Sequence, residues 1–519
     1  MFVVTLLCLL IFKSIEASRI LVCVPCPSVS HQVMFYPLII ELLNRGHEVV
    51  FITTDPIYPK DKTPANLTEI DTHDVSYKGW REIILSGETT QGTKGDGYQQ
   101  VRLMIPLLTK SFEMQMLTPE VQDMIKKKTH FDLLIVEGLS KAAQVLSHVF
   151  KAPMILMNSL GGIQNNYHVM GAPIYPKLLY PIFWHQKLHN MSILDKIKVL
   201  WDMYKIEKFY DDFRVEENLI VKRLFGPDTP SLEDLGDNVS MLFLNVYPIW
   251  EYNRPVPPGI LFIGGLHKKP QKELPKYLKA YLDSSERGVV YFSLGTNVSP
   301  STLSAEKIQT LTNGLAKLKY DVLVKWDYDE LPGKGNNTKV SKWLPQSDLL
   351  RHPNIKAFVT QGGLQSFDEA MTGGVPLVGI PMLGDQWFNV ERYASLKIGI
   401  ALLMEELTED ILANAVNTVI DDPSYRRNLI DLREKIRDQP ESALQRAVWW
   451  TEHVIRHKGA PHLRAPAANM RWADYLDLEL WATIALIALT ALAAAATALY
   501  LLLRFVKRIL NESFKLKKA

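Results

Sequence analysis

The stretch Phe358-Val-Thr-Gln-Gly-Gly-Leu-Gln-Ser-Phe-Asp-Glu-Ala370 carries most of the information about the fold of this chain. An apolar run is followed by two glycines and then by residues with helical spacing, which predicts a strand, a tight turn and a helix. The glycines let a ligand approach the backbone, and the helix N-terminus at Gly363 to Ser366 offers free N–H groups to a phosphate. A strand that leads into a helix in this way is typical of α/β proteins with a parallel sheet.

The sequence around this stretch repeats the pattern of strand and helix. It continues through Gly374-Val-Pro-Leu-Val-Gly-Ile-Pro-Met-Leu-Gly-Asp-Gln386, which places Asp385 and Gln386 just beyond a strand, where a carboxylate and an amide could bind sugar hydroxyls. Glu369 lies one turn into the predicted helix, in reach of a ribose. Further strands are predicted at Gly288–Ser293, Asp321–Val324, Ile355–Thr360 and Pro376–Ile380.

The first half of the chain has the same character. Arg19–Pro25 and Glu48–Thr53 are short, apolar and rich in β-branched residues, and Gln32–Asn44 between them has helical spacing. This βαβ unit predicts a second parallel sheet covered by helices. Further strands are predicted at Phe131–Val136, Pro153–Met157 and Ser240–Tyr247, whereas Tyr58–Gln100 is polar, glycine-rich and predicted to form loops.

The proline-rich segment Arg254-Pro-Val-Pro-Pro-Gly259 marks the boundary between the two halves. We expect a first domain over 18–255, a linker over 256–284 and a second domain over 285–470. Ligands of parallel sheets bind at the carboxyl ends of the strands, so the expected site is the cleft between the domains. The segment Tyr167–Lys222 is rich in aromatic residues and leaves three interpretations open: a lid over the site, a surface that touches a membrane, or ordinary helix packing.

Composition and charge exclude several classes of protein. The chain has 519 residues, of which 47% are hydrophobic and 22% charged, so it is globular and not disordered. Its net charge of +2 gives no reason to expect a nucleic-acid partner. The charge is unevenly placed, because the tail from Arg504 to Ala519 is strongly basic and the body is slightly acidic.

Both ends of the chain have the character of membrane-targeting signals. Phe2–Phe12 is apolar but too short to span a bilayer, which predicts a signal peptide over residues 1–17. Leu480–Leu503 carries no charge and is long enough to form a transmembrane helix. The basic tail over 504–519 then lies in the cytosol and the body in the lumen. N-x-S/T triplets that permit glycosylation of such a body start at Asn66, Asn190, Asn238, Asn297 and Asn336.

Two cysteines remain beyond the predicted signal peptide, in Cys23-Val-Pro-Cys26. Their spacing is that of a redox motif, although a cysteine inside an apolar strand also serves as a small hydrophobic residue. No G-x-G-x-x-G follows the first strand, and the sequence holds no P-loop, no H-E-x-x-H and no Cys/His metal cluster. We therefore expect neither a dinucleotide cofactor nor a metal.

These motifs resemble the family 1 UDP-glycosyltransferases of animals over nearly the whole chain. Phe358 to Gln386 is similar to the signature of that family, and Trp343-Leu-Pro-Gln346 lies upstream of it as in the family. The resemblance implies two facing Rossmann-like domains, the GT-B fold, with a UDP-sugar in the second domain and an acceptor in the first. It also implies a single-pass protein of the endoplasmic reticulum membrane, and the tail ending Lys515-Leu-Lys517-Lys518-Ala519 resembles a retrieval signal.

The resemblance also implies roles for individual residues. Trp343 would stack on uracil, Gln346 would lie near the base or ribose, and Glu369 would bind the ribose. Asp385 and Gln386 would bind the transferred sugar, and Arg254 at the domain crossover would reach the donor. The residues expected to line the diphosphate are Ser293, Thr296, Thr360, Gly363 and Ser366.

Two positions depart from the pattern of the family. Gln361 stands where many members have histidine, so it can donate a hydrogen bond to phosphate but carries no charge; in this it resembles insect members. His31, after the first strand, matches the catalytic base, and its pKa near neutrality suits proton abstraction from a hydroxyl. The carboxylate that should hold its other ring nitrogen is Glu137 where the family has aspartate, with Asp132 as the alternative.

The sequence thus predicts an enzyme that transfers a sugar, glucose in the first place, from a UDP-sugar to a hydroxyl of a small lipophilic acceptor, with inversion to a β-glycoside. No metal is required if hydroxyls and helix N-termini meet the charge of the leaving group. Two alternatives stay open: transfer of glucuronate, or a membrane-anchored binding protein that has lost turnover. A homo-oligomer is compatible with either.

Overall fold

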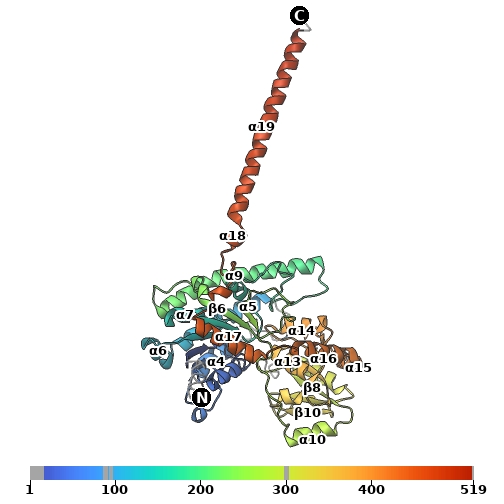
Figure 1. Cartoon of the computed structure of the whole chain (residues 1–519). Coiled ribbons are helices and arrows are strands. Elements are labelled where there is room, and N and C mark those ends of the chain that lie inside the picture. The colour runs from blue at the N-terminus through green and yellow to red at the C-terminus, as the bar shows by residue number, and fades with distance from the viewer. Residues whose placement is uncertain (1–16, 86–91, 93–96, 297–302, 517–519) are drawn as a thin grey trace, which may run out of the picture.

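Two parallel sheets lie side by side in the computed structural model, one in each half of the chain (Figure 1). The structure describes residues 17–85, 92, 97–296 and 303–516. All but the last residue of the predicted signal peptide, the glycosylation triplet at Asn297 and the end of the basic tail lie outside the described residues. The two-domain α/β architecture predicted from the sequence is confirmed.

The first sheet has seven strands in the order β3-β2-β1-β4-β5-β6-β7, all parallel. Its strand order reverses between β1 and β4, so the loops after these two strands open to opposite sides and leave a crevice between them. The central strands are buried on both faces, which explains their unbroken apolar sequences. The strands are β1 (Arg19–Cys23), β2 (Glu48–Thr53), β3 (Leu67–Asp71), β4 (Leu133–Glu137), β5 (Met154–Asn158), β6 (Val239–Leu244) and β7 (Ile260–Phe262).

The second sheet has six parallel strands in the order β10-β9-β8-β11-β12-β13, and its order reverses between β8 and β11. The segment Phe358–Ala370 forms the end of β11, the turn and helix α13 as predicted. The strands are β8 (Val289–Ser293), β9 (Asp321–Lys325), β10 (Thr338–Ser341), β11 (Ile355–Thr360), β12 (Leu377–Gly379) and β13 (Gly399–Ala401).

Helices cover both sheets. Those of the first half are α2 (Val29–Gln32), α3 (Tyr36–Asn44), α4 (His73–Leu85), α5 (Gly97–Met116), α6 (Pro119–Lys126), α7 (Leu146–Phe150), α8 (Gln164–Met170) and α9 (Ile193–Phe225). Those of the second half are α10 (Lys276–Ser284), α11 (Ala305–Ala316), α12 (Gln346–Leu349), α13 (Leu364–Gly373), α14 (Gln386–Ser395), α15 (Glu409–Asp421), α16 (Pro423–Arg437) and α17 (Ala443–His457). Short 3₁₀ turns are η1 (Lys60–Lys62), η2 (Ala142–Val145), η3 (Asp234–Asn238) and η5 (Pro461–Leu463).

The prediction of loops over Tyr58–Gln100 is wrong. This segment contains the edge strand β3, helix α4 and the start of α5. Only Leu67 and Ile70 of β3 are buried, so the strand carries polar residues on its open side and lacks the apolar run of an inner strand. An inner strand is buried on both faces and therefore has an apolar run that can be recognised in the sequence. An edge strand is buried on one face only and has no such run.

The domain boundary also differs from the prediction. β7 belongs to the first sheet and pairs with β6, so the first domain extends beyond residue 255. Helix α10 joins the second domain, where Asn354 donates a hydrogen bond to the carbonyl of Leu282 at its end (2.8 Å). The predicted linker over 256–284 therefore shortens to the segment between β7 and α10.

The helix α17 returns from the second domain to the first. Its apolar residues Ala447, Val448 and Val454 belong to the core that also contains helix α3. Arg45 at the end of α3 forms an ion pair with Glu452 of α17 (3.2 Å). The chain thus crosses the cleft twice, which limits the arrangements that the two domains can adopt.

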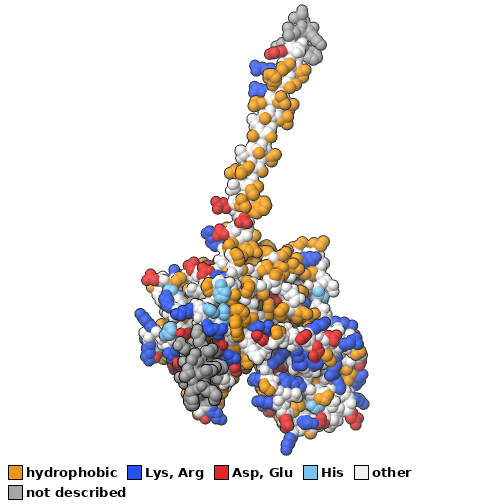
Figure 2. Space-filling model, viewed as in Figure 1, with side chains coloured by type: hydrophobic (Ala, Val, Ile, Leu, Met, Phe, Trp, Pro, Cys, Tyr) orange, Lys and Arg blue, Asp and Glu red, His pale blue; other side chains and the backbone are white. Residues whose placement is uncertain are grey.

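The last helices, α18 (Trp472–Tyr475) and α19 (Leu478–Leu516), leave the body of the protein (Figure 1). Within α19, the span Leu478–Ser513 exposes its side chains along its length, and an 18-residue window of it reaches a mean hydropathy of 2.3. Figure 2 shows these hydrophobic side chains standing away from the body, with basic residues near the far end. By length and composition α19 can cross a membrane, and it contains the predicted span 480–503.

Candidate active site

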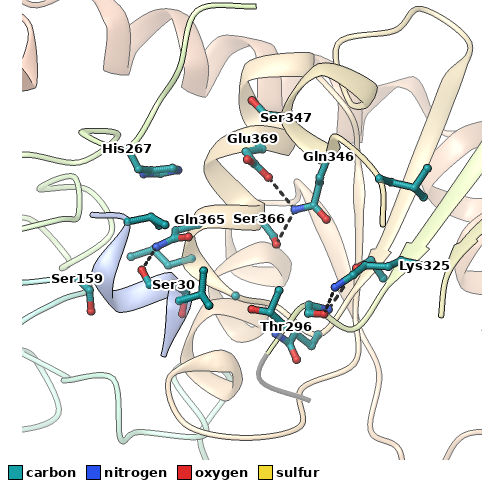
Figure 3. A pocket seen from close by; sticks show the side chains of 18 of the residues that line it. Ser30, Ser159, His267, Thr296, Lys325, Gln346, Ser347, Gln365, Ser366 and Glu369 are labelled. Atoms are coloured by element: carbon teal, nitrogen blue, oxygen red, sulfur yellow. Dashed lines mark hydrogen bonds between the residues drawn. The ribbon is translucent and has the colours of Figure 1, made fainter. Parts of the chain in front are cut away.

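A cavity of about 350 Å³ lies between the two domains, where the carboxyl ends of both sets of strands meet (Figure 3). Most of the residues predicted from the sequence line it. On the first domain this is His31. On the second domain they are Ser293, Thr296, Trp343, Gln346, Gln361, Gly363, Ser366, Glu369, Asp385 and Gln386.

Three predicted residues do not line the cavity. Glu137 lies behind His31, and Thr360 is fully buried, with its hydroxyl accepting a hydrogen bond from the backbone N–H of Gly362 (3.4 Å). Arg254 is also buried, and its guanidinium donates to the carbonyls of Pro173, Tyr180 and Pro181 at 2.8–3.0 Å.

The placement of Arg254 differs from the expectation that it reaches the donor. Its guanidinium carbon lies 4.1 Å from the ring centroid of Tyr167, whose hydroxyl donates to Glu251 (2.9 Å). The rigid fork of a guanidinium suits a cluster of carbonyls, and here its Nη1 and Nη2 groups donate to a loop of the first domain. Arg254 therefore orders that loop in this structure.

His31 is held by residues that follow three neighbouring strands of the first sheet. His31 follows β1, Glu137 ends β4 and Ser159 follows β5. Nδ1 of His31 lies 2.5 Å from Oε1 of Glu137 and 2.8 Å from Oγ of Ser159. Because Nδ1 is engaged on the protein side, Nε2 is the nitrogen left for a ligand.

Glu137 is in turn fixed by the backbone, since its Oε2 accepts a hydrogen bond from the N–H of Cys26 (3.3 Å). Asp132, the alternative partner, accepts from the N–H of Arg19 (2.8 Å) at the opposite end of the strands. Glu137 therefore occupies the position predicted for the partner of His31, and Asp132 does not.

The pKa of His31 reflects opposing influences. Burial disfavours the imidazolium, whereas Cys26 and the Glu137 carboxylate favour it, and the pKa of His31 rises well above its usual range. The pKa near neutrality expected from the sequence is therefore corrected upward, because the sequence did not show these buried neighbours. Asp385 belongs to the second domain, and burial raises its pKa although the field of His31 opposes the rise. The base candidate of one domain and the sugar-binding candidate of the other thus face each other across the cavity.

The two cysteines are free and buried. Burial raises the pKa of both thiols, which disfavours the thiolate that redox chemistry needs. Cys26, His31 and Glu137 do form a group whose potential ligand atoms lie within 4.8 Å of one another. This set could hold a metal ion, and the sequence did not reveal it because Glu137 lies 106 residues beyond His31 in the chain. His31 and Glu137 contact each other directly through Nδ1, however, so a metal there would displace their hydrogen bond.

The N-terminus of α13 forms the phosphate-binding candidate of the second domain. Gly363 precedes the helix without a side-chain cap, so the first N–H groups of the helix remain available. Gly362 before it has φ +92°, and a Cβ there would lie 2.4 Å from Cγ2 of Val390. Gly362 is therefore needed both for the turn and for its packing against α14, whereas Gly363 has φ −62° and a Cβ there would make only an ordinary contact with Gln361 (3.8 Å).

A chain of hydrogen bonds organises the neighbouring ribose-binding candidates (Figure 3). Gln346 Nε2 donates to Glu369 Oε2 (2.7 Å) and to Ser366 Oγ (3.0 Å), and Gln346 Oε1 accepts from the hydroxyl of Tyr291 (3.0 Å). Burial raises the pKa of Glu369 to about 7, although the hydrogen bond from Gln346 opposes the rise. Glu369 is thus poised to change its charge near neutral pH.

Trp343 stands at the rim of the cavity with 67% of its side chain exposed, as a stacking platform for a planar base would. Lys325 Nζ lies 5.3 Å from its ring centroid and donates to the carbonyl of Gly295 (2.6 Å). Gly295 has φ +78°, and a Cβ there would lie 2.2 Å from Nε2 of Gln361. Oε1 of Gln361 is buried and has no hydrogen-bond partner among the described residues, so this amide has capacity for a ligand.

Asp385 and Gln386 begin helix α14. Asp385 Oδ2 accepts from Asn389 (2.7 Å), and Gln386 Oε1 accepts from the N–H groups of Met382 and Leu383 (both 2.9 Å). These bonds fix the orientation of the Gln386 carboxamide, with its oxygen toward Met382 and Leu383 and its NH₂ group away from them. An oriented amide donor beside a carboxylate acceptor suits a ligand that carries hydroxyls.

Several cavity residues were missed by the sequence analysis. Ser159 and Lys325 each lie at the carboxyl end of a predicted strand, and that position alone could have marked them. Gln365 lies within the quoted motif, and its side chain donates to the backbone carbonyl of Ser30, joining the two domains beside His31 (Figure 3). His267, Lys268 and Lys269 line the cavity from the interdomain segment and carried no recognisable signal.

The two facing α/β domains with a cavity between them form the GT-B fold. Solved glycosyltransferases share this fold: VinC in complex with dTDP matches with a TM-score of 0.58 at 18% identity, covering 85% of this chain and 100% of that one. Arabidopsis thaliana UGT89C1, complexed with UDP-L-rhamnose, matches with a TM-score of 0.56 at 17% identity, covering 85% and 99%.

Residues 19–513 match the model of the family described as "UDP-glucoronosyl and UDP-glucosyl transferase", and the chain belongs to this family. It is 34% identical to the ecdysteroid UDP-glucosyltransferase of Lymantria dispar multicapsid nuclear polyhedrosis virus, over 93% of this chain and 96% of the relative. It is 30% identical to human UDP-glucuronosyltransferase 2B17, over 87% of each. The protein is therefore an enzyme that transfers a sugar from a UDP-sugar.

Proposed function

We propose that this enzyme transfers glucose from UDP-glucose to a hydroxyl of a small lipophilic acceptor, with His31 as the general base. The observation that carries the proposal is the position of His31. It lines the cavity, opposite the second domain, and has Nδ1 engaged by Glu137 and Ser159. When His31 is neutral, its Nε2 can take the proton of an acceptor hydroxyl. Because the pKa of His31 is raised, the neutral fraction grows as pH rises, and transfer should be faster on the alkaline side of neutrality.

The reaction then runs as an in-line displacement. The acceptor oxygen loses its proton to His31 and forms a bond to the anomeric carbon, while the bond between that carbon and the phosphate oxygen breaks. UDP leaves with the bonding electrons, and the configuration inverts from α to β. Glu137 stabilises the imidazolium that forms on His31.

Charge on the departing UDP is met by groups of the second domain. The N–H groups at the start of α13, the hydroxyls of Thr296 and Ser366 and the ammonium of Lys325 all border the cavity. Together they offer preorganised positive ends of dipoles and one cation, so the mechanism needs no metal. Trp343 would stack on uracil, and Glu369 with Gln346 would bind the ribose.

The choice of glucose rests on the relatives. The viral relative is named for an ecdysteroid substrate and UDP-glucose chemistry, and its identity to this chain exceeds that of the human relative. Transfer of glucuronate is the second candidate, since that sugar adds a carboxylate. Arg254 does not line the cavity and offers this carboxylate no partner, but Lys268 and Lys269 line the cavity and could pair with it.

We further propose that α19 anchors the enzyme in the endoplasmic reticulum membrane, with the body in the lumen and the basic tail in the cytosol. Lumenal glycosylation could occur at Asn336, which is exposed. The amide of Asn66 is less suited to it, because it donates to the carbonyls of Leu43 and His47 (3.0 and 2.9 Å).

The test uses membranes from cells that express the full chain. UDP-glucose or UDP-glucuronate is added with a mixture of phenols and alcohols, and UDP release and product mass are followed. A mass increase of one hexose with UDP-glucose alone supports the proposal. Adducts with UDP-glucuronate alone would replace it by the second candidate. UDP-sugar binding without any adduct would indicate a binding protein that has lost turnover.

A further inference from the structure

Helix α9 has apolar residues on two opposite faces. The inner face packs on the body through Met203, Ile206 and Phe213, which are all buried. The outer face exposes large apolar side chains over its first three turns: Ile193 and Leu194 (77% each), Ile197 (59%), Leu200 (42%), Trp201 (59%) and Tyr204 (51%).

The spacing of these residues makes a continuous stripe. Steps of three and four residues lead from Ile193 through Ile197 and Leu200 to Tyr204, and such steps keep side chains on one face of a helix. A helix at the surface of a water-soluble domain has one apolar face, turned inward. A second apolar face of this size indicates a second apolar surrounding.

The stripe lies beside the foot of the membrane-spanning helix. Trp472 of α18 contacts the rings of His168 and Tyr175, with ring centroids 5.5 and 5.3 Å apart. In the same loop as Tyr175, Lys177 forms an ion pair with Glu207 of α9. This chain of contacts fixes the start of α19 next to the outer face of α9.

The figures show the same arrangement. In Figure 1, α9 lies across the face of the body from which α18 and α19 leave. In Figure 2, hydrophobic side chains gather on that face around the foot of α19. The loop before α9 contributes further exposed residues, Tyr175 (42%) and Leu179 (58%).

We propose that this surface, formed by Ile193, Ile197, Leu200, Trp201 and Tyr204 with Tyr175 and Leu179, lies in the interfacial layer of the bilayer that α19 spans. The inference rests on the proposed anchoring by α19. Because α19 enters the bilayer within a few residues of Trp472, any membrane that holds it also lies against this face of the body.

The chemistry of the surface favours a lipid interface over a protein partner. Tryptophan and tyrosine are the residues that prefer the boundary between headgroups and acyl chains. The exposed lysines 196 and 198 flank the stripe, where long basic side chains can reach headgroups. A helix lying in the interface beside a spanning helix gives the body two points of attachment and fixes its orientation.

The surface also connects to the active site. Directly before α9, the N–H of Leu188 donates to Glu391 of α14 (3.3 Å), and His189 pairs with the same carboxylate (3.0 Å). Helix α14 begins with Gln386, which lines the cavity. The segment that leads into α9 is thus joined to the sugar-donor side of the cleft. On this proposal the cleft lies close to the bilayer, into which lipophilic acceptors partition.

The test places a nitroxide spin label on the full chain in lipid nanodiscs. In a Cys8→Ser background, in which the remaining native cysteines are buried, single variants Ile197→Cys, Leu486→Cys and Arg427→Cys are labelled. Ile197 lies on the stripe, Leu486 in α19, and Arg427 is an exposed residue of α16 in the second domain. Collision rates with lipid-soluble oxygen and with a water-soluble nickel chelate are measured.

The inference predicts a several-fold higher ratio of oxygen to nickel accessibility at position 197 than at position 427. A label at 197 that is as open to the nickel chelate as the label at 427 would overturn it, and so would one shielded from both reagents, which would indicate a protein partner. The label at 486 reports the anchoring separately. If it is water-exposed, the proposed anchor fails; if it lies in lipid while 197 does not, only the present inference fails.

The glycosylation triplet at Asn190 gives an independent test, because it lies three residues before the stripe. A glycan is bulky and strongly hydrated, so it cannot share an interface with Ile193 and Leu194. Mass spectrometry of the full chain from a glycosylating host should find Asn190 unmodified and the exposed Asn336 modified. A glycan on Asn190 would overturn the inference.

Discussion

Nδ1 of His31 lies 2.5 Å from Oε1 of Glu137, although 106 residues separate the two in the chain. The parallel pairing of β1 with β4 brings them together, because His31 follows the carboxyl end of β1 and Glu137 is the last residue of the adjacent β4. Family members with aspartate in place of Glu137 have one methylene less. Here the longer side chain reaches the imidazole while its second oxygen accepts from the N–H of Cys26.

We expect Glu137→Gln to lower kcat by about 10²–10⁴-fold, because the amide cannot stabilise the imidazolium by charge. Loss of the carboxylate also removes one cause of the raised pKa of His31. The acidic limb of the kcat profile should therefore move to lower pH, since the base is then deprotonated earlier as pH rises. Steady-state rates over a pH series check both effects.

The matched control for this variant is Asp132→Asn. This residue precedes the same strand, but its carboxylate accepts a hydrogen bond from Arg19 and does not contact His31. It should leave the position of the acidic limb unchanged. If Glu137→Gln behaves like this control, Glu137 does not act on His31.

The sequence made the residues on the central strands predictable, and for a physical reason. Strands buried on both faces have apolar runs, and the polar residues that follow them mark the edge where ligands bind. His31, Glu369 and Asp385 were found by this reasoning together with the family resemblance. β3 was not, because only one face of this edge strand is buried.

The orientation of individual side chains could not be predicted in the same way. The family resemblance implied that Arg254 reaches the donor, but its guanidinium donates hydrogen bonds to three carbonyls of the first domain. Lys325 and Gln365 enter the site through contacts with Gly295 and Ser30, which depend on how loops meet in space. Neighbours in space and not in sequence decide such contacts.

Glu369 should make donor binding depend on pH. Its pKa is about 7, so the group is a neutral acid below this pH and a carboxylate above it. Only the carboxylate accepts hydrogen bonds from both ribose hydroxyls, so KM for the UDP-sugar should fall as pH rises through about 7. In Glu369→Gln this dependence should disappear. A wild-type KM that is constant between pH 6 and 8 would contradict the assignment.

Gly295→Ala should lower the affinity for the UDP-sugar and should have only a small effect on folding stability. The new Cβ would lie 2.2 Å from Nε2 of Gln361 and would displace that amide from the phosphate region. We expect a rise in KM for the UDP-sugar of tenfold or more, by order of magnitude. Steady-state kinetics with varied donor measures it.

Gly46→Ala serves as the control for Gly295→Ala. Gly46 has φ +91°, and a Cβ there would meet nothing within 4 Å, so this variant carries the backbone strain alone. Both variants should lose about 1 kcal/mol of folding stability. Equal donor affinity in the two would show that the contact between Gly295 and Gln361 has no part in binding.

Chelation of divalent metals should leave the transfer rate unchanged, because N–H groups, hydroxyls and Lys325 are proposed to meet the charge of the leaving UDP. Rates are compared before and after dialysis against EDTA, with re-addition of Mg²⁺, Mn²⁺ or Zn²⁺. A rate that falls on dialysis and returns with one metal would contradict the proposal. The group Cys26, His31 and Glu137 would then be the first place to seek the ion.

The most direct test of the account is the effect of His31→Ala on turnover and on donor affinity, measured on the same full-length preparation. UDP-sugar affinity comes from calorimetry or from competition with UDP, and turnover from product mass. The account predicts a loss of turnover of at least about 10²-fold with donor affinity within a few-fold of wild type. Retention of wild-type turnover would contradict it, because another group would then have to take the proton.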